Sequence, residues 1–129
     1  MGYNEKMDVR IRATDFQLTS GITDFVQQRL GPIEKILGND AALARCEVEL
    51  GRSGASRHGE YTWFAEIQVM CPGDERVIAR NQEPTMNAAI DNAQAEAMMQ
   101  LRKHKRLHSR VMRRTGAAVK RWMRWANPA

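Results

Sequence analysis

The spacing of hydrophobic positions changes several times along the chain, and each change predicts a new secondary-structure element. Residues 8–14 alternate apolar and polar side chains, which is typical of a half-buried strand. Apolar side chains then recur at steps of three and four up to about residue 37, which predicts a helix. Thr19 or Ser20 can cap its start, and Gly38-Asn39 ends it. Pro32 lies inside this helix and has no backbone N–H, so we expect a kink there rather than two helices.

The remaining pattern predicts three more strands and a second helix. Alternation returns in three stretches, at residues 44–50, 61–71 and 76–80. The polar, glycine-rich residues 51–60 predict a long loop, and Pro72-Gly73-Asp74 predicts a turn. Residues 81–84 lead into a helix that runs from Pro84 to Arg114. The order β-α-β-β-β-α predicts an α+β fold of two layers, in which a four-stranded sheet carries both helices on one face.

The second predicted helix has two chemically different halves. Its apolar stripe holds as far as Leu101, and the positions that would continue the stripe carry His104, Lys105 and His108. Four arginines share another side of the helix at steps of four, four and three: Arg102, Arg106, Arg110 and Arg113. We therefore expect the first half to pack on the sheet and the second to project as a cationic rod. The whole helix would be roughly 45 Å long.

Charge is divided along the chain in the same way. The protein has 129 residues, enough for one domain at 7–114 between a flexible lead-in at 1–6 and a basic tail at 115–129. Residues 1–100 carry 10 basic and 15 acidic side chains, whereas residues 101–129 carry 10 basic side chains and no acidic one. This asymmetry favours a polyanionic partner, either a nucleic acid or an anionic membrane surface.

The candidate chemistry is sparse. Cys46 and Cys71 lack metal-type spacing, so we expect buried free thiols in a reducing cytoplasm. His104 and His108 stand four apart, as metal ligands can, but cationic neighbours oppose a bound cation. His58 and Glu60 form an acid–base pair only in composition. We expect no enzyme activity, no metal and no cofactor.

The ends of the chain leave alternatives open. No apolar run approaches the roughly 20 residues that span a membrane, and the N-terminus lacks a signal-peptide core, so we expect a cytoplasmic protein. Trp122 and Trp125 lie among bases in the tail. They could stack on RNA bases, pack back onto the domain or lie on a membrane surface.

Several segments resemble the ribosome hibernation-promoting factor family, also called ribosome-associated inhibitors or ribosomal subunit interface proteins. The resemblance covers roughly residues 7–110. Its segments begin at Asp8-Val-Arg-Ile-Arg, Leu30…Ile33-Glu34-Lys35, Glu66-Ile-Gln-Val…Pro72-Gly73 and Met86…Ala88-Ala89-Ile90-Asp91, the last followed by Gln100-Leu101-Arg102-Lys103-His104-Lys105. Asn87 stands where the family often has an aromatic residue, and Met98-Met99 where it often has an acid–base pair. We expect a short form, without the C-terminal dimerisation domain of the long members.

The resemblance implies a fold similar to that of double-stranded-RNA-binding domains and a non-catalytic inhibitor of translation. Such a protein docks on the 16S-type rRNA of the small ribosomal subunit and blocks the sites of mRNA and tRNA, under stress or in stationary phase. It implies a bacterial protein, monomeric off the ribosome and without a membrane partner. The bases that match the family pattern are Lys35, Arg102, Lys103, Lys105 and Arg106. Charge and position alone add Arg29, Arg110, Arg113 and Arg114.

Two other hypotheses remain open. The chain could be a protein-binding module that acts on the transcription machinery, since members of the family have been described as modulators of a sigma factor. A small ribonuclease using His58 is more remote. Sedimentation with small subunits, and its sensitivity to salt, would separate these hypotheses.

Overall fold

The computed structural model describes residues 7–53, 62–73 and 75–114, and for 106–114 only the helical backbone. Its elements along the chain are β1 (Asp8–Thr14), α1 (Ser20–Leu37), a short 3-10 helix η1 (Gly38–Leu43), β2 (Arg45–Ser53), β3 (Thr62–Cys71), β4 (Glu75–Glu83) and α2 (Met86–Arg114). The predicted lead-in at 1–6 and the tail at 115–129 lie outside the described residues, as do His58 and Glu60.

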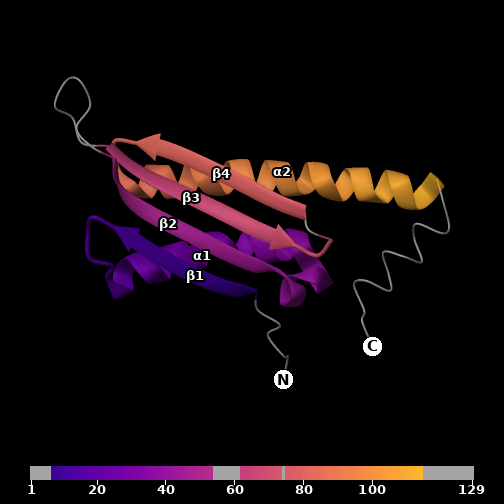
Figure 1. Ribbon diagram of the computed structural model, residues 1–129, viewed down its shortest axis with the longest axis horizontal. Helices are drawn as coiled ribbons and strands as arrows, with labels where there is room; N and C mark the ends of the chain where they lie inside the picture. Colours follow the sequence, from indigo (N-terminus) through magenta and orange to yellow (C-terminus); the bar gives the residue numbers. More distant parts are fainter. Residues whose placement is uncertain (1–6, 54–61, 74, 115–129) are drawn as a thin grey trace.

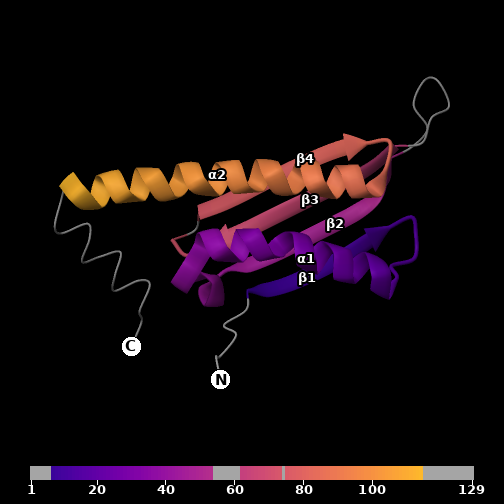
Figure 2. The ribbon, with the colours of Figure 1, turned by 180° about the vertical axis from the view of Figure 1, so that it is seen from behind.

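The sheet has four strands in the order β1-β2-β3-β4. β1 pairs with β2 in parallel, and the other two pairs are antiparallel. Figures 1 and 2 show both helices on one side of the sheet, running side by side, while the other side is open. This two-layer β-α-β-β-β-α arrangement confirms the predicted α+β fold.

α1 begins and ends at the residues that the sequence indicates. The Thr19 hydroxyl accepts a hydrogen bond from the Ile22 backbone N–H at 3.3 Å, which satisfies one of the free donors of the first turn. At the other end Gly38 has a φ of 58°, which favours glycine, and its N–H donates to the Glu34 carbonyl. Pro32 lies within one continuous helix, as expected, and the kink stays a prediction.

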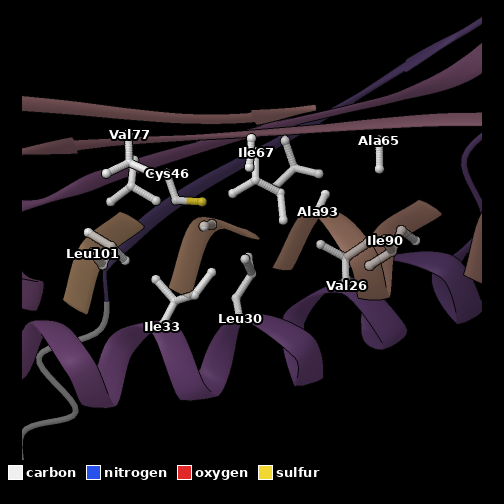
Figure 3. Packing of buried hydrophobic residues seen from close by; sticks show 14 of the residues in the cluster. Val26, Leu30, Ile33, Cys46, Ala65, Ile67, Val77, Ile90, Ala93 and Leu101 are labelled. Atoms are coloured by element: carbon white, nitrogen blue, oxygen red, sulfur yellow. The ribbon is translucent and has the colours of Figure 1, made fainter. Parts of the chain in front are cut away.

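The core fills the space between the sheet and the two helices (Figure 3). Alternate residues of each strand point toward the helices, because successive side chains of a strand lie on opposite faces. The centre of this layer contains Ile67 and Val69 from β3, which meet Leu30 and Ile33 from α1 in one cluster of buried side chains. The α2 side of the cluster is made of Ala89, Ile90, Ala93, Ala97 and Leu101.

Three predicted boundaries are wrong. β2 continues through Ser53 and pairs with the start of β3 at Thr62, so the loop predicted at 51–60 begins too early. β4 continues to Glu83, because it pairs with β3 along its whole length, so residues 81–83 are strand rather than lead-in. η1 was not predicted, because its residues show no regular spacing of apolar side chains. α2 begins at Met86, two residues later than predicted, where the Thr85 hydroxyl accepts from the Ala88 N–H at 3.1 Å.

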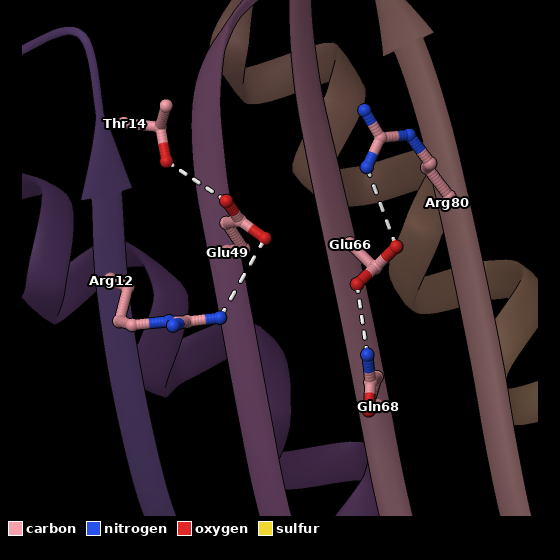
Figure 4. A network of polar contacts seen from close by, with 6 residues as sticks. All are labelled: Arg12, Thr14, Glu49, Glu66, Gln68 and Arg80. Carbon is pink, nitrogen blue, oxygen red and sulfur yellow. Dashed lines mark hydrogen bonds and ion pairs between the residues drawn. The ribbon is translucent and has the colours of Figure 1, made fainter.

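The open side of the sheet carries polar side chains that bond to one another across strands and along β3 (Figure 4). Glu49 accepts from the Thr14 hydroxyl at 2.8 Å and pairs with Arg12 at 3.8 Å. Glu66 accepts from the Gln68 amide at 2.9 Å and pairs with Arg80 at 3.4 Å. These acidic side chains therefore have basic or polar partners within the sheet itself.

Candidate nucleic-acid interface

The first half of α2 lies close against the sheet because its inward positions are small. Ala89, Ala93 and Ala97 are fully buried, and Leu101 is the last buried residue of the helix for which burial is described. The Gln100 amide donates to the backbone carbonyl of Ile78 at 3.0 Å, which ties the helix to the outer edge of β4. The predicted apolar half of α2 is confirmed.

His104 marks the point where α2 leaves the sheet. Its Nδ1 lies 3.4 Å from a carboxylate oxygen of Glu75, the first residue of β4. Figures 1 and 2 show the helix continuing past this end of the sheet. His104 thus faces the domain. The signal for this was present in the sequence, because position 104 continues the apolar stripe, but its partner Glu75 is 29 residues away and could not be identified.

α1 and α2 are joined by polar contacts at both ends of their shared length. Near the start, Arg29 pairs with Asp91 at 2.7 Å, and the Gln94 amide donates to the Arg29 carbonyl at 2.5 Å. The Arg29 guanidinium also lies over the Phe25 ring, 4.6 Å from its centre. Arg29, which was a candidate by charge alone, therefore has an acidic partner and a place between the helices.

Lys105 makes the second connection. Its ammonium donates to the carbonyl of Ile36 at 2.9 Å, in the last turn of α1, where the backbone carbonyls lack helical donors. A cation is favoured at this end of a helix because the peptide dipoles leave partial negative charge there. The contact brings the basic segment of α2 beside Lys35, which is exposed in the same turn of α1.

Arg102 and Lys103 are exposed on the outer side of α2. Within the described part of the chain, no carboxylate lies within ion-pair distance of either side chain. The structure therefore brings four predicted residues to one end of the helical layer, namely Lys35, Arg102, Lys103 and Lys105. Arg106, Arg110, Arg113 and Arg114 belong to α2 by backbone, and their side chains lie outside the described residues.

Nothing among the described residues forms a metal site. No group of three or more histidine, cysteine, aspartate or glutamate side chains converges there. Burial, with Glu34 and Glu47 nearby, raises the pKa of the Cys46 thiol to about 12. Burial, with Glu75 and Asp40 nearby, raises the pKa of Cys71 to about 11. Both thiols therefore keep their protons at neutral pH, and neither is poised as a nucleophile.

None of the helices in the described ranges is long and apolar enough to cross a membrane. The exposed bases Lys35, Arg102 and Lys103 place positive charge at the end of α1 and along the middle of α2. Backbone-directed charge of this kind binds phosphates and carries no base-specific information.

Comparison with protein families decides the membership of the chain. A profile described as "Sigma 54 modulation protein / S30EA ribosomal protein" matches residues 9–108. The chain belongs to this family. The residues of this chain that match the S30EA profile begin in β1 and end in the basic part of α2. They therefore include both the sheet and the exposed bases Arg102, Lys103 and Lys105.

Solved structures similar to this S30EA-family chain have the same fold. The N-terminal domain of Protein Y from Thermus thermophilus is 21% identical, with a TM-score of 0.59, and the match covers 76% of this chain and 99% of that one. A ribosomal subunit interface protein from Coxiella burnetii is 13% identical, with a TM-score of 0.60, and the match covers 77% and 98%. Curated protein sequences give no match. The predicted resemblance to the hibernation-promoting factor family is confirmed by the profile and by these neighbours.

Proposed function

We propose that this protein binds the small ribosomal subunit through its rRNA and inhibits translation by occupying the sites of mRNA and tRNA. The observation that carries the proposal is the pair of exposed bases Arg102 and Lys103, which have no carboxylate within ion-pair distance among the described residues, in a chain of the S30EA family. Residues 101–129 contain ten bases and no acid, and mutual repulsion among them is relieved when a polyanion binds. The RNA-contacting residues would be Lys35, Arg102, Lys103, Lys105, Arg106, Arg110, Arg113 and Arg114.

The shape of the protein suits occlusion. The sheet and the first half of α2 share one buried core, and the basic half of α2 projects beyond the sheet (Figure 1). A rod of this kind can enter a channel lined with phosphates while the body blocks its opening. No catalytic group is required, because the inhibition would come from steric exclusion. The protein would act in the cytoplasm of a bacterium, as a monomer, under stress or in stationary phase.

A matched pair of variants tests where binding resides. One carries R102A, K103A, K105A and R106A in α2, and the other carries R10A, R12A, R45A and R76A on the exposed open side of the sheet. Both lose four positive charges. The first should fail to sediment with purified bacterial small subunits and to inhibit translation in an extract, whereas the second should keep most of both activities. Circular dichroism confirms that each variant is folded.

Inhibition by occlusion predicts a second result, which is independent of where on the protein the RNA binds. The protein and initiator tRNA on mRNA should exclude each other from the same subunit, so preloading the subunit should relieve inhibition. A stable complex of protein, tRNA and subunit that still fails to translate would contradict occlusion and leave RNA binding alone. If the protein does not sediment with subunits at low salt, the proposal fails, and the sigma 54 modulation named in the family description becomes the next function to test.

A further inference from the structure

Gly31 lies in the middle of α1 with empty space where a side chain would be. A Cβ atom built on it would meet no atom within 4 Å outside the adjoining helix backbone and its two chain neighbours. The positive-φ glycines among the described residues are Gly38 and Gly73, so Gly31 has an ordinary helical backbone. Glycine destabilises a helix interior relative to alanine. Neither a positive φ nor a contact with another part of the described fold requires glycine at this position.

The next residue adds a second destabilising feature to the same turn. Pro32 has no N–H, so the carbonyl of Gln28 lacks the donor that an ordinary helix supplies four residues later. Gly31 eases the accommodation of Pro32, because a residue before proline is crowded in the helical conformation and the crowding involves its Cβ. The two residues therefore lie together in a turn that has no side chain at position 31 and in which the Gln28 carbonyl lacks its helical donor.

This stretch lies on the outer ridge of α1. Gln28, Gly31 and Lys35 are three and four residues apart and share one side of the helix. Gln28 and Lys35 are exposed, whereas Leu30 and Ile33 on the other side are buried in the core. The ridge ends beside the basic segment of α2, because Lys105 bonds to the carbonyl of Ile36, the residue after Lys35. Figure 2 shows the two helices side by side on the same face of the sheet.

We propose that Gln28, Gly31 and Lys35 form a close-contact track for the sugar–phosphate backbone of an RNA strand, an inference that rests on the proposed function. Lys35, continued by Arg102 and Lys103, neutralises phosphates. Gly31 leaves room for a ribose to lie against the helix backbone. The Gln28 carbonyl accepts a hydrogen bond from the 2′-hydroxyl of that ribose.

Charge and chemistry select this occupant. The end of the ridge at Lys35 is positive and adjoins three further bases, so an anionic strand is favoured over an acidic or neutral helix of the protein itself. A carbonyl that has lost its helical donor can accept from another group, and the 2′-hydroxyl is the donor that distinguishes RNA from DNA along a backbone. The bases of this surface recognise only the charge of the strand. The track adds close contact with a ribose at Gly31 and a preference for RNA over DNA through the Gln28 carbonyl.

Variants in the full-length chain separate the track from the stability of the helix. P32A restores the N–H to the Gln28 carbonyl and removes the crowding that glycine eases. G31A added to P32A then introduces only a methyl group into the empty space. Each step should raise the melting temperature by improving the helix, while each should weaken binding to small subunits, by roughly three- to tenfold for one lost polar contact. G31L on the same background should weaken binding further.

Gly21 supplies the matched control. It lies in the first turn of α1, and its Cβ would approach no atom closer than the Thr19 hydroxyl at 3.9 Å. G21A should leave small-subunit binding unchanged. A labelled oligouridylate and its deoxy counterpart test the ribose contact, because P32A should reduce the preference for the ribose form.

The outcomes are distinguishable. Wild-type protein that ignores small subunits contradicts the proposed function itself. Wild-type binding that survives G31A and G31L on the P32A background overturns the track alone. A fall in melting temperature on G31A in that background also overturns it, because the glycine would then serve the fold. Equal loss of binding in G21A would show that the effect is not local, and this too would overturn the track.

Discussion

On the open side of the sheet, the ring of Phe64 packs against a position that has no side chain. Gly51 in β2 lies opposite Phe64 in β3. A Cβ at Gly51 would lie 2.5 and 2.7 Å from two atoms of the Phe64 ring, and 3.0 Å from the Thr14 carbonyl oxygen. The ring is 6% exposed, with the Arg80 guanidinium 4.2 Å from its centre. The ring of Phe64 thus occupies the space that a side chain at position 51 would need.

We expect Gly51→Ala to destabilise the protein by about 1–3 kcal/mol, since the methyl group forces the ring from its place. Urea denaturation measures the change. In a Phe64→Leu background the same substitution should be milder, because the branched chain leaves more room beside β2. An undiminished loss in that background would assign the effect to the backbone of β2 instead.

The raised pKa values of Cys46 and Cys71 predict that the folded protein loses stability at alkaline pH. The pKa of Cys46 is about 12 and that of Cys71 about 11 in the folded chain, each raised mainly by burial. Unfolding returns them to about 9, so the unfolded chain releases these protons first and gains population as the pH rises above 9. The free energy of unfolding should fall by about 1.4 kcal/mol per pH unit per thiol. Cys46→Ala should reduce this slope between pH 9 and pH 11, whatever it does to stability at pH 7.

At the scale of elements, the polar contacts between α1 and α2 set the direction of the projecting helix. Lys105 holds the last turn of α1, Asp91 and Gln94 hold Arg29, and His104 meets the start of β4. These contacts lie on the sides of α2 that face the domain. Arg102 and Lys103 remain on its outer side. Among the bases of α2 whose side chains are described, Lys105 therefore joins two elements, whereas Arg102 and Lys103 have no ion-pair partner in the described part of the chain.

Lys105→Ala and Lys103→Ala should separate these two roles. Removing Lys105 loses the hydrogen bond to the Ile36 carbonyl, so we expect a destabilisation of about 0.5–1 kcal/mol. Removing Lys103 loses no described contact, and stability should stay within about 0.5 kcal/mol of wild type. Both should weaken binding to small subunits. Chemical denaturation and sedimentation give the two measurements, and equal destabilisation by the two variants would contradict the division.

The sequence predicted the elements better than it predicted the contacts between them. β1, α1 and the turn at Pro72-Gly73 were found because period and capping are local properties of the chain. The extensions of β2 and β4 were missed, since Gly51 and Asn81 join their strands through pairing with β3. The bases Lys35, Arg102, Lys103 and Lys105 were named from their match to the family pattern, but the attachment of Lys105 to Ile36 depends on residues 69 apart in sequence, which no local pattern contains.

At the scale of the whole molecule, the basic part of the sequence is also separated in space from the rest of the domain, because α2 continues past the sheet. Residues 1–100 carry more acids than bases, whereas the seven bases from Arg102 to Arg114 lie on a helix that continues past the sheet. Binding should therefore be strongly salt-dependent. Each neutralised phosphate contributes a slope of about −0.7 to −0.9 to the dependence of log affinity on log salt concentration.

Titration of small-subunit binding against potassium chloride measures this slope. The R102A, K103A, K105A and R106A variant should show a slope shallower by roughly 3, as expected for four lost contacts. The variant on the open side of the sheet should keep the slope of wild type. A wild-type affinity that does not change with salt would contradict binding by phosphate neutralisation.

The parallel pairing of β1 with β2 has a consequence for how the chain folds. β3 pairs with both β2 and β4, which are near it in sequence, whereas β1 reaches β2 only after α1 and η1 intervene. Closing that longer loop costs more entropy than forming either hairpin, so it should come late. Pulse-labelled hydrogen exchange should find the amides of β1 protected after those of β3. The strand that is synthesised first would then be the last to find its partner, and Val9 and Ile11 would stay exposed on the nascent chain until β2 has formed.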